Sequence, residues 1–390
     1  MTLEHTGRRF QTLAVHAGER RPGPEGSLVF PIFQGTVYGV APGTSYHDIK
    51  YLRLSSTPSQ KYLHEKLAAL EGGEAALATA SGMAAFTSTL LASLEAGDHV
   101  LASDALYGGT QDFLVRGAPA LGWSCTFVDA QRPETWKEHL RPSTRLFLVE
   151  TIGNPRMRVP RLGQVVSFAR EHGLTSLIDN TFATPANFRP LEIGFDLVFH
   201  SATKYLNGHS DIVAGCVVGA RERIGRIRET LNLYGGSLDP HAGFLLARGI
   251  KTLALRVSAQ NANALAVARF LASHPKVREV NYPGLETHPD HATAREFLRG
   301  FGGMLSFRLK GGVDAAQALF ESVTVPFIGP SLGGVETLMT RPSTTSHAGL
   351  SPEEMERAGI APDLVRMSCG IESSDDLVED LGRALDSVPA

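Results

Sequence analysis

The chain has 390 residues, of which 43% are hydrophobic and 20% are charged, and its formal net charge is −3. This composition is typical of a globular protein of two or three domains, and it lacks the basic excess of nucleic-acid-binding proteins. No run approaches the roughly 18 apolar residues that span a bilayer. The scattered Cys125, Cys216 and Cys369 lack the spacing of disulfide frameworks or zinc sites. We therefore expect a soluble, cytoplasmic protein without a metal, a membrane segment or a nucleic-acid partner.

Residues 1–55 are rich in Gly, Pro and Ser, as in "RRPGPEGSLVFPIFQGTVYGVAPGTSYHD". They show no clear helical or strand period. A segment without a hydrophobic face of its own has to pack on another surface, so the sequence predicts an extended N-terminal arm.

Residues 56–255 have a different pattern. The segment 60–73 has helical spacing and ends in two glycines, and the segment 74–98 contains an apolar run, a turn and a second helix. Short apolar runs then alternate with helix-like segments such as 161–173. This alternation predicts an α/β domain with a mainly parallel sheet that is covered on both faces. The apolar runs lie at 99–104, 145–150, 175–180, 196–200 and 211–219.

A long helical stretch at 241–275 leads into the last region, residues 256–390. This region mixes apolar runs at 277–285 and 302–312 with a helix-like segment at 315–323. It predicts a smaller α+β domain at the C-terminus. The expected parts are therefore an arm (1–55), a large domain (56–255) and a C-terminal domain (256–390).

Polar residues follow the predicted strands, and in open parallel sheets ligands gather beyond these strand ends. Asp179 and Lys204 are 25 positions apart (204 − 179), about one helix plus one strand, so we expect them to face one crevice. A carboxylate and a lysine with hydroxyls alongside suit pyridoxal phosphate, which has a basic ring nitrogen, an imine-forming aldehyde and a phosphate. The strand-end residues are Asp104, Glu150, Asp179, Asn180, Ser201, Thr203 and Lys204.

The segment "ASGMAAF", residues 80–86, offers a place for the phosphate. Ser81 can cap a helix, Gly82 lets the backbone approach closely, and the first helical turn presents free N–H groups to an anion. Ser201 and Thr203 add hydroxyl donors. The ring of Tyr107, beyond another strand end, can stack on a pyridine.

Seven segments carry a more specific signal: "SGMAAFTSTLL", "LYGGT", "IDNTFATP", "SATKYLNGHSDIVAG", "IKTLALR", "SLGGVE" and "LVRMSCGIES". Together they resemble the pyridoxal-phosphate enzymes of cysteine and methionine metabolism, which include cystathionine γ-lyase, cystathionine γ-synthase, cystathionine β-lyase and methionine γ-lyase. The resemblance covers nearly the whole chain. It implies the fold of the type I pyridoxal-phosphate-dependent transferases and a homotetramer built from two tight dimers.

The resemblance also implies roles for individual residues. Lys204 holds the cofactor as an imine and shuttles protons, which requires a neutral amine, and burial favours that form. Asp179 pairs with the pyridine nitrogen, and Tyr107 stacks on the ring and takes a proton from the substrate amino group. Ser331 orients Lys204, and Glu150 has no assigned role. The remaining implied contacts are Ser81, Gly82, Met83, Ser201 and Thr203 with the phosphate, Tyr51 and Arg53 with the phosphate of the adjacent subunit, and Arg366, Asn154, Ser331 and Glu336 with the substrate.

Several positions bear on the choice of family member. Methionine γ-lyases usually carry a cysteine at the position of Gly109, and Glu336 in "SLGGVE" suits the distal ammonium of cystathionine. Two departures weaken that assignment, since Lys50 replaces an acidic residue before the arm tyrosine and Arg341 stands where histidine is common. The sequence predicts a carbon–sulfur lyase that acts on cystathionine by γ-elimination and forms a thiol amino acid, 2-oxobutanoate and ammonia.

Other functions stay open. Cystathionine γ-synthase, or another γ-replacement on an O-acylhomoserine, shares the early steps, and methionine γ-lyase is a further alternative. A non-catalytic pyridoxal-phosphate-binding protein is a remote one. A dinucleotide-dependent oxidoreductase would need a G-x-G-x-x-G turn after the first strand, and "ALEGGEAALATASG" lacks that spacing.

Overall fold

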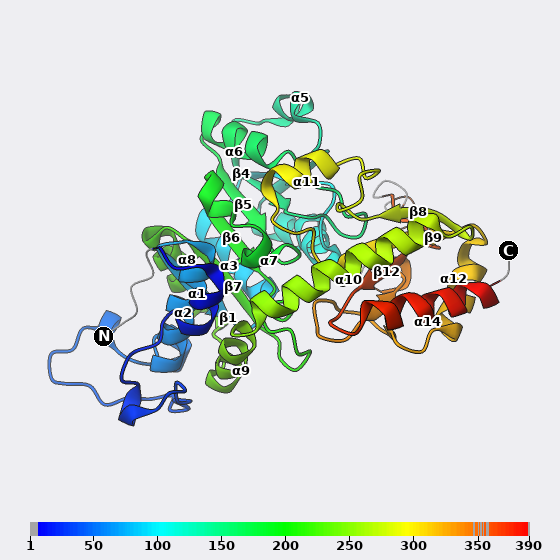
Figure 1. The fold of residues 1–390 in the computed structure, drawn as a ribbon. Helices are drawn as coiled ribbons and strands as arrows, with labels where there is room; N and C mark the ends of the chain where they lie inside the picture. The colour runs from blue at the N-terminus through cyan, green and yellow to red at the C-terminus, as the bar shows by residue number, and fades with distance from the viewer. Residues whose placement is uncertain are drawn as a thin grey trace. The chain divides into compact units, whose positions relative to one another are not determined.

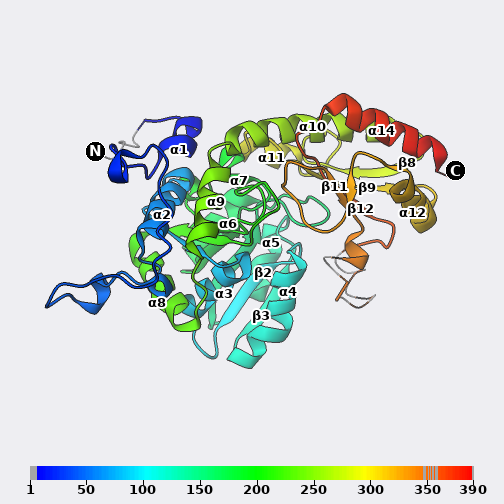
Figure 2. The ribbon, with the colours of Figure 1, turned by 90° about the horizontal axis from the view of Figure 1, so that it is seen from below.

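The computed structural model describes residues 7–345, 348–349, 351, 353, 355 and 359–388. The course of the chain is shown in Figures 1 and 2. Among the described residues, no helix combines the length and the apolar character needed to cross a membrane. The predicted division into an arm and two domains stays a prediction. The contacts within the chain instead define a first compact unit of Met1–Glu95, Thr175–Thr181 and Arg189–Ala254, and a second of Ala96–Leu174, Phe182–Phe188 and Leu255–Ala390.

Four strands of the first unit pair in the order β1-β7-β6-β5. The β5 and β6 strands are parallel, with Asp179 opposite Phe199, whereas β7 is antiparallel to both of its neighbours. Both β6 and β7 are buried along their whole length, which explains their uninterrupted apolar sequences. The bounds are Ala75–Thr79 (β1), Thr175–Asp179 (β5), Leu197–His200 (β6) and Gly215–Gly219 (β7).

Several α-helices of the first unit begin at a capping residue or end at a glycine. Thr57 and Gln60 form a capping box at the start of α2, and Gly72 ends this helix in the left-handed conformation with φ of 74°. The short α1, which packs on α2, lies inside the predicted arm and was not anticipated. Figure 2 shows the segment that follows α1 reaching away from α2 and α8. The helices are Phe10–His16 (α1), Pro58–Glu71 (α2), Gly82–Ser93 (α3), Arg221–Tyr234 (α8) and Pro240–Ile250 (α9).

The second unit contains three parallel strands and a separate five-stranded sheet. The parallel strands pair in the order β4-β2-β3, with bounds His99–Ser103 (β2), Ser124–Val128 (β3) and Thr144–Glu150 (β4). The other sheet has the order β10-β11-β12-β9-β8 and is antiparallel except between β10 and β11. Its strands are Val277–Asn281 (β8), Met304–Leu309 (β9), Phe327–Ile328 (β10), Leu338–Thr340 (β11) and Val365–Ser368 (β12).

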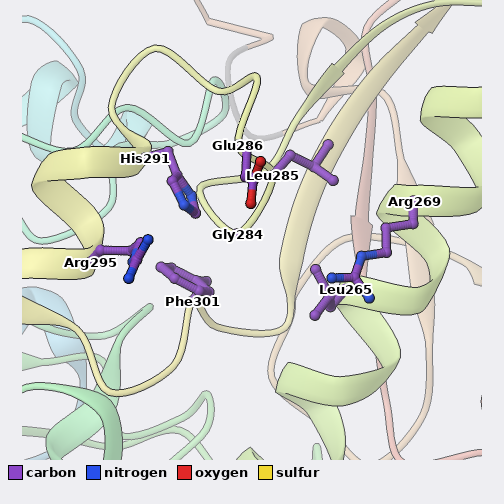
Figure 3. Close-up of a pocket in the computed structure, with 8 residues that line it drawn as sticks. All are labelled: Leu265, Arg269, Gly284, Leu285, Glu286, His291, Arg295 and Phe301. Carbon is purple, nitrogen blue, oxygen red and sulfur yellow. The ribbon is translucent and has the colours of Figure 1, made fainter.

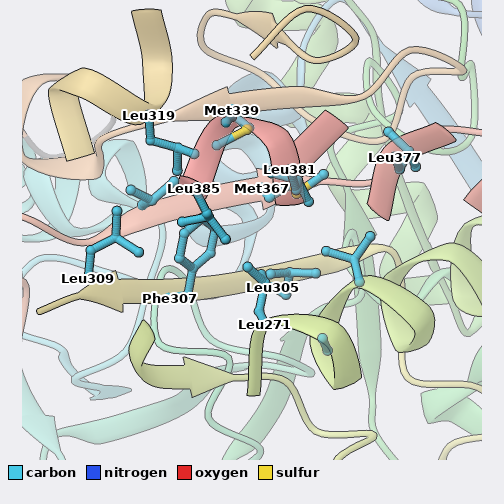
Figure 4. Packing of buried hydrophobic residues seen from close by; sticks show 14 of the residues in the cluster. Leu271, Leu305, Phe307, Leu309, Leu319, Met339, Met367, Leu377, Leu381 and Leu385 are labelled. Carbon is cyan, nitrogen blue, oxygen red and sulfur yellow. The ribbon is translucent and has the colours of Figure 1, made fainter. Parts of the chain in front are cut away.

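The five-stranded sheet forms a hydrophobic core with three helices, as Figure 4 shows. Leu377, Leu381 and Leu385 recur at every fourth position of α14 and are fully buried, so one face of this helix packs on the sheet. The α-helices of this unit are Gly108–Asp112 (α4), Pro133–Trp136 (α5), Leu162–Glu171 (α6), Thr184–Asn187 (α7), Leu253–Ser273 (α10), His291–Phe297 (α11), Gly312–Ser322 (α12) and Ser374–Ser387 (α14).

The helical stretch predicted at 241–275 is interrupted. It forms α9 and α10, with Lys251 and Thr252 between them. Asp239 caps α9 by accepting hydrogen bonds from the N–H groups of His241 and Ala242. The helix therefore begins at Pro240, a residue that suits the first helical position. The five predicted apolar runs of the large domain contain β2, β4, β5, β6 and β7.

Candidate active site

The carboxylate of Asp179 stands at the end of β5, where Thr181 holds it. The Thr181 N–H donates to Asp179 Oδ1 at 2.9 Å, and the Thr181 hydroxyl donates to the same oxygen. The Thr181 hydroxyl in turn accepts a hydrogen bond of 2.9 Å from the Ser201 N–H. One threonine therefore links the end of β5 to the segment that follows β6 and fixes the direction of the Asp179 side chain.

The surroundings of Asp179 act on its charge in opposite directions. Burial is the largest influence and raises the pKa of the Asp179 carboxyl, while the two hydrogen bonds from Thr181 and the charge of His200 lower it. The net result is a raised pKa. A protonated ring nitrogen placed against this carboxylate would favour its ionised form, because an opposite charge offsets the cost of burial.

The first turn of α3 is where the sequence predicts the phosphate site, and the contacts that this turn makes are consistent with anion binding. Ser81 caps the helix and accepts the Ala84 N–H at 3.0 Å. A side-chain carbon on Gly82 would lie only 2.8 Å from both Cα and Cβ of Ser201, so the absence of a side chain brings the start of α3 against residue 201. Met83 contributes one of the first-turn N–H groups. Ser81, Gly82 and Ser201 therefore surround one spot, where backbone N–H groups can meet an anion.

The turn that carries Lys204 is tied down by its own backbone. The Lys204 N–H donates to the Ser201 carbonyl at 3.1 Å, and the Gly208 N–H donates to the Lys204 carbonyl at 2.7 Å. The Thr203 hydroxyl makes two hydrogen bonds of 3.0 Å with the backbone of Ala214, and the Thr203 N–H donates to the Ala214 carbonyl at 3.0 Å. These contacts hold the loop after β6 against the start of β7. The Thr203 hydroxyl is therefore engaged with the Ala214 backbone. The contact of Thr203 with the phosphate stays a prediction.

Tyr51 and Arg53 lie on the arm. Arg53 donates to the Asn232 carbonyl at 3.0 Å, and its guanidinium lies 5.5 Å from the centre of the Tyr51 ring. Within the described residues, neither side chain hydrogen-bonds to Ser81, Ser201 or Thr203 of the same chain. A role toward the phosphate of an adjacent subunit stays a prediction.

In the second unit, Glu150 accepts a hydrogen bond from the Tyr107 N–H. Glu150 ends β4 and is buried, whereas the Tyr107 side chain is 45% exposed and accessible to a ligand. A side-chain carbon on Gly109 would lie 2.6 Å from Tyr107 Cε1, so the ring occupies space that any other residue at 109 would fill. The sequence left Glu150 without a role, and the structure shows that it fixes the backbone of Tyr107.

The predicted carboxylate-binding residues of the second unit meet. The buried Arg366 on β12 donates to Asn154 Oδ1 at 3.0 Å and to the Ser331 carbonyl at 3.3 Å. Ser331 has a φ of 89°, a left-handed conformation that is rare outside glycine and that sets the direction of its carbonyl. Glu336 lies further along the same segment, with its backbone against Gly370. Its contact with a substrate stays a prediction.

A buried group behind Asp179 was missed by the sequence analysis. Glu71, at the end of α2, accepts hydrogen bonds from His200 Nε2 at 2.5 Å and from Asn180 Nδ2 at 3.1 Å. Glu71 thus joins the residue after β5 to the last residue of β6, and it steadies both strand ends. His200 directly precedes Ser201, so its position next to the candidate site was visible in the sequence. Its partner Glu71 was not, because 129 positions of the chain separate the two residues.

Comparisons with known proteins point to one family of enzymes. The sequence profile described as "Cys/Met metabolism PLP-dependent enzyme" matches residues 11–386. L-methionine gamma-lyase of Pseudomonas putida is 41% identical over 385 residues, which are 96% of this chain and 97% of that protein. Cystathionine gamma-lyase of Bacillus subtilis is 38% identical over 379 residues, which are 97% and 99% of the two chains.

A solved structure, cystathionine gamma synthase from Xanthomonas oryzae pv. oryzae in complex with aminoacrylate and cysteine, has a TM-score of 0.94 and 37% identity. The match covers 98% of this chain and 99% of that one. These matches confirm the predicted resemblance, the type I fold and the cofactor, pyridoxal phosphate. The residues fit this cofactor, because the carboxylate of Asp179, the start of α3 and Lys204 lie on connected segments of one unit.

Proposed function

Because the chain belongs to the pyridoxal-phosphate-dependent enzymes of cysteine and methionine metabolism, we propose that it is a carbon–sulfur lyase that expels the γ-sulfur of cystathionine. The products are a thiol amino acid, 2-oxobutanoate and ammonia. The observation that carries the proposal is the connected set in the first unit. There Thr181 holds Asp179 and accepts the Ser201 N–H, and Ser201 lies against Gly82 at the start of α3.

Bound pyridoxal phosphate supplies an aldehyde that captures the substrate amino group and a ring that withdraws electrons from its Cα. We assign the other tasks to this chain. The first turn of α3 and Ser201 bind the phosphate, and Asp179 holds the proton of the ring nitrogen. Lys204 would hold the aldehyde carbon of the cofactor, and its free amine would carry a proton from the substrate Cα.

Substrate contacts come from the second unit. Arg366 binds the substrate carboxylate with its planar fork of N–H groups, and Asn154 and the Ser331 carbonyl hold that fork in place. Tyr107 takes a proton from the incoming amino group and stacks on the ring, and Ser331 also orients Lys204. Glu336 receives the distal ammonium of cystathionine.

Two activities compete with this proposal. Methionine γ-lyase is supported by the 41% identity to the Pseudomonas putida enzyme, and γ-replacement is supported by the likeness to a cystathionine gamma synthase structure. The test is to measure keto acids formed from cystathionine, methionine, homocysteine and cysteine, and then to measure cystathionine formed from O-acylhomoserine with cysteine. The proposal predicts 2-oxobutanoate from cystathionine alone. Product from O-acylhomoserine plus cysteine only would show γ-replacement, and no product at all would show a binding protein.

We also propose that the protein is a cytoplasmic homotetramer in which Tyr51 and Arg53 reach the phosphate of a neighbouring subunit. The arm exposes apolar side chains, with Leu28 at 94%, Val37 at 74% and Val40 at 57% of full exposure. Burial of these side chains against a second copy would favour association. Light scattering of the full chain and of Val37→Asp tests this, because a charge in that contact should lower the mass.

A further inference from the structure

The second unit contains a cavity whose lining includes none of the candidate active-site residues. Its volume is about 360 Å³, within the range of small-molecule sites. Two helices contribute residue pairs one turn apart, Leu265 and Arg269 from α10 and His291 and Arg295 from α11. The loop after β8 and the ring of Phe301 complete the wall, as Figure 3 shows.

The cavity presents two cationic groups that are free to bind an anion. Among the described residues, neither Arg269 nor Arg295 has a hydrogen-bond or ion-pair partner. Both side chains are exposed to solvent at the cavity wall. A guanidinium offers a planar fork of N–H donors that matches a carboxylate.

The same cavity also presents acceptors. Glu286 places a carboxylate in the wall. His291 Nδ1 lies 2.8 Å from the Pro283 carbonyl oxygen, which can only accept, so Nδ1 carries the hydrogen and Nε2 of the neutral ring is an acceptor. Donors for an anion and acceptors for a cation in one cavity match a zwitterion.

The rest of the wall is apolar. The Phe301 ring lies 5.6 Å from the His291 ring, measured between ring centres, and Leu265 and Leu285 line the same cavity. Figure 3 shows Phe301 beside His291 and Arg295, with Leu265 and Arg269 approaching from α10. An aliphatic side chain that binds here leaves water and gains contacts with Phe301, Leu265 and Leu285.

We propose that this cavity is a second, non-catalytic site for a free α-amino acid with an apolar side chain. Arg295 binds its carboxylate, Glu286 and His291 bind its ammonium, and Phe301 with Leu265 and Leu285 receives its side chain, while Arg269 adds positive charge at the opposite wall. Binding at this site does not involve the cofactor. If L-leucine did not bind here, the proposed lyase activity would be unaffected.

The test measures L-leucine binding by calorimetry to holoenzyme that has first been reduced with borohydride. Reduction fixes the cofactor to its lysine, so the catalytic site can no longer capture an amino group covalently. Variants of the cavity wall then separate binding in the cavity from residual non-covalent binding at Arg366. We expect one saturable site per chain. Arg295→Gln and Glu286→Gln should each weaken binding about tenfold, the scale of one lost charged hydrogen bond. The matched control is Arg170→Gln, an exposed arginine on α6 that does not line this cavity and should leave binding unchanged.

Two further probes identify the ligand class. The keto acid 4-methyl-2-oxopentanoate lacks the ammonium and should bind about tenfold more weakly than L-leucine. Inorganic phosphate lacks both the ammonium and the apolar part and should bind more weakly still. The proposal is overturned if reduced enzyme does not bind L-leucine, if the two variants bind it as wild type does, or if phosphate binds more tightly. Keto-acid production by the untreated variants reports separately on the lyase proposal.

Discussion

The candidate cofactor residues of the first unit and the candidate substrate residues of the second are held in different ways. Asp179, Thr181 and Ser201 are within 22 positions of one another (201 − 179) and share two short hydrogen-bonded links. Arg366 reaches Asn154, which is 212 positions away in the chain. The cofactor end is therefore built from neighbouring strand ends, whereas the substrate end depends on tertiary packing of distant segments. One stretch of sequence contains the links from Asp179 to Ser201, whereas the contact of Arg366 with Asn154 joins two separate stretches.

The largest effect is expected at the substrate end. Arg366→Ala removes a bidentate donor and should lower kcat/KM for cystathionine by roughly 100-fold or more, since each charged hydrogen bond contributes roughly 1.5–3 kcal/mol. The visible absorption of the cofactor should stay unchanged, because we assign Arg366 to the substrate carboxylate and not to the cofactor. Arg366→Lys should rescue little of the loss, since an ammonium lacks the fork. If kcat/KM of Arg366→Ala fell by less than threefold, Arg366 would not be a substrate-binding residue.

A smaller effect is expected at the cofactor end. Thr181→Val keeps the side-chain shape but removes the hydroxyl donor to Asp179 and the acceptor of the Ser201 N–H. The cofactor dissociation constant should rise about tenfold. Because the Thr181 hydroxyl lowers the pKa of Asp179, its removal raises that pKa further, and the acid-side change of the cofactor spectrum should move to higher pH.

Thr181→Ser is the matched control, because it restores the hydroxyl and should restore both the affinity and the pH at which the spectrum changes. Equal behaviour of the valine and serine variants would show that the side-chain hydrogen bonds of Thr181 do not tune Asp179.

A third change tests the position of one ring. Gly109→Ala places a carbon 2.6 Å from Tyr107 Cε1, so the ring has to move. We expect kcat to fall about tenfold, since a displacement of this size disturbs a reacting geometry. Gly225→Ala on α8 is the control, because a carbon there meets nothing within 4 Å. Unchanged kcat in Gly109→Ala, measured from keto-acid release, would show that the orientation of Tyr107 does not matter.

The same contrast explains what the sequence could and could not predict. The strands β2, β4, β5, β6 and β7 and their polar ends were predictable, because apolar runs and turn residues are local signals. The strand β3 was not predicted, and most of its residues are only half-buried. The role of Glu150 was not, because its bond to the Tyr107 backbone joins residues 43 positions apart. Glu71 was missed for the same reason, since its contact with His200 spans 129 positions. The helix α1 was missed because seven residues are too few to establish a period, although Phe10, Leu13 and Ala14 have helical spacing, and its stability comes from packing on α2.

The smallest effect on activity is expected at Lys66, a lysine of the first unit that is fully buried yet lies outside the candidate site. Its ammonium donates to the carbonyls of Ala14 and Val15 at 3.0 and 3.1 Å, at the end of α1. Burial lowers the pKa of Lys66 to about 7, with Lys251 adding to the shift and Glu19 opposing it. Lys66→Met should therefore leave the kcat per bound cofactor unchanged but alter how stability depends on pH.

The sign follows from proton binding. Between about pH 7 and the ordinary pKa of lysine, 10.5, Lys66 is largely neutral in the folded protein and protonated in the unfolded chain. The unfolded chain thus binds more protons, so the contribution of Lys66 to the free energy of unfolding rises with pH, by about 1 kcal/mol per pH unit. Melting temperatures of wild type and Lys66→Met at pH 7, 8 and 9 should diverge in favour of wild type. Lys61→Met changes an exposed lysine on the same helix, so the difference between its melting temperature and that of wild type should be the same at pH 7, 8 and 9. A constant difference for Lys66→Met as well would mean that Lys66 stays protonated when buried, and that burial alone does not prepare a lysine of this unit for chemistry.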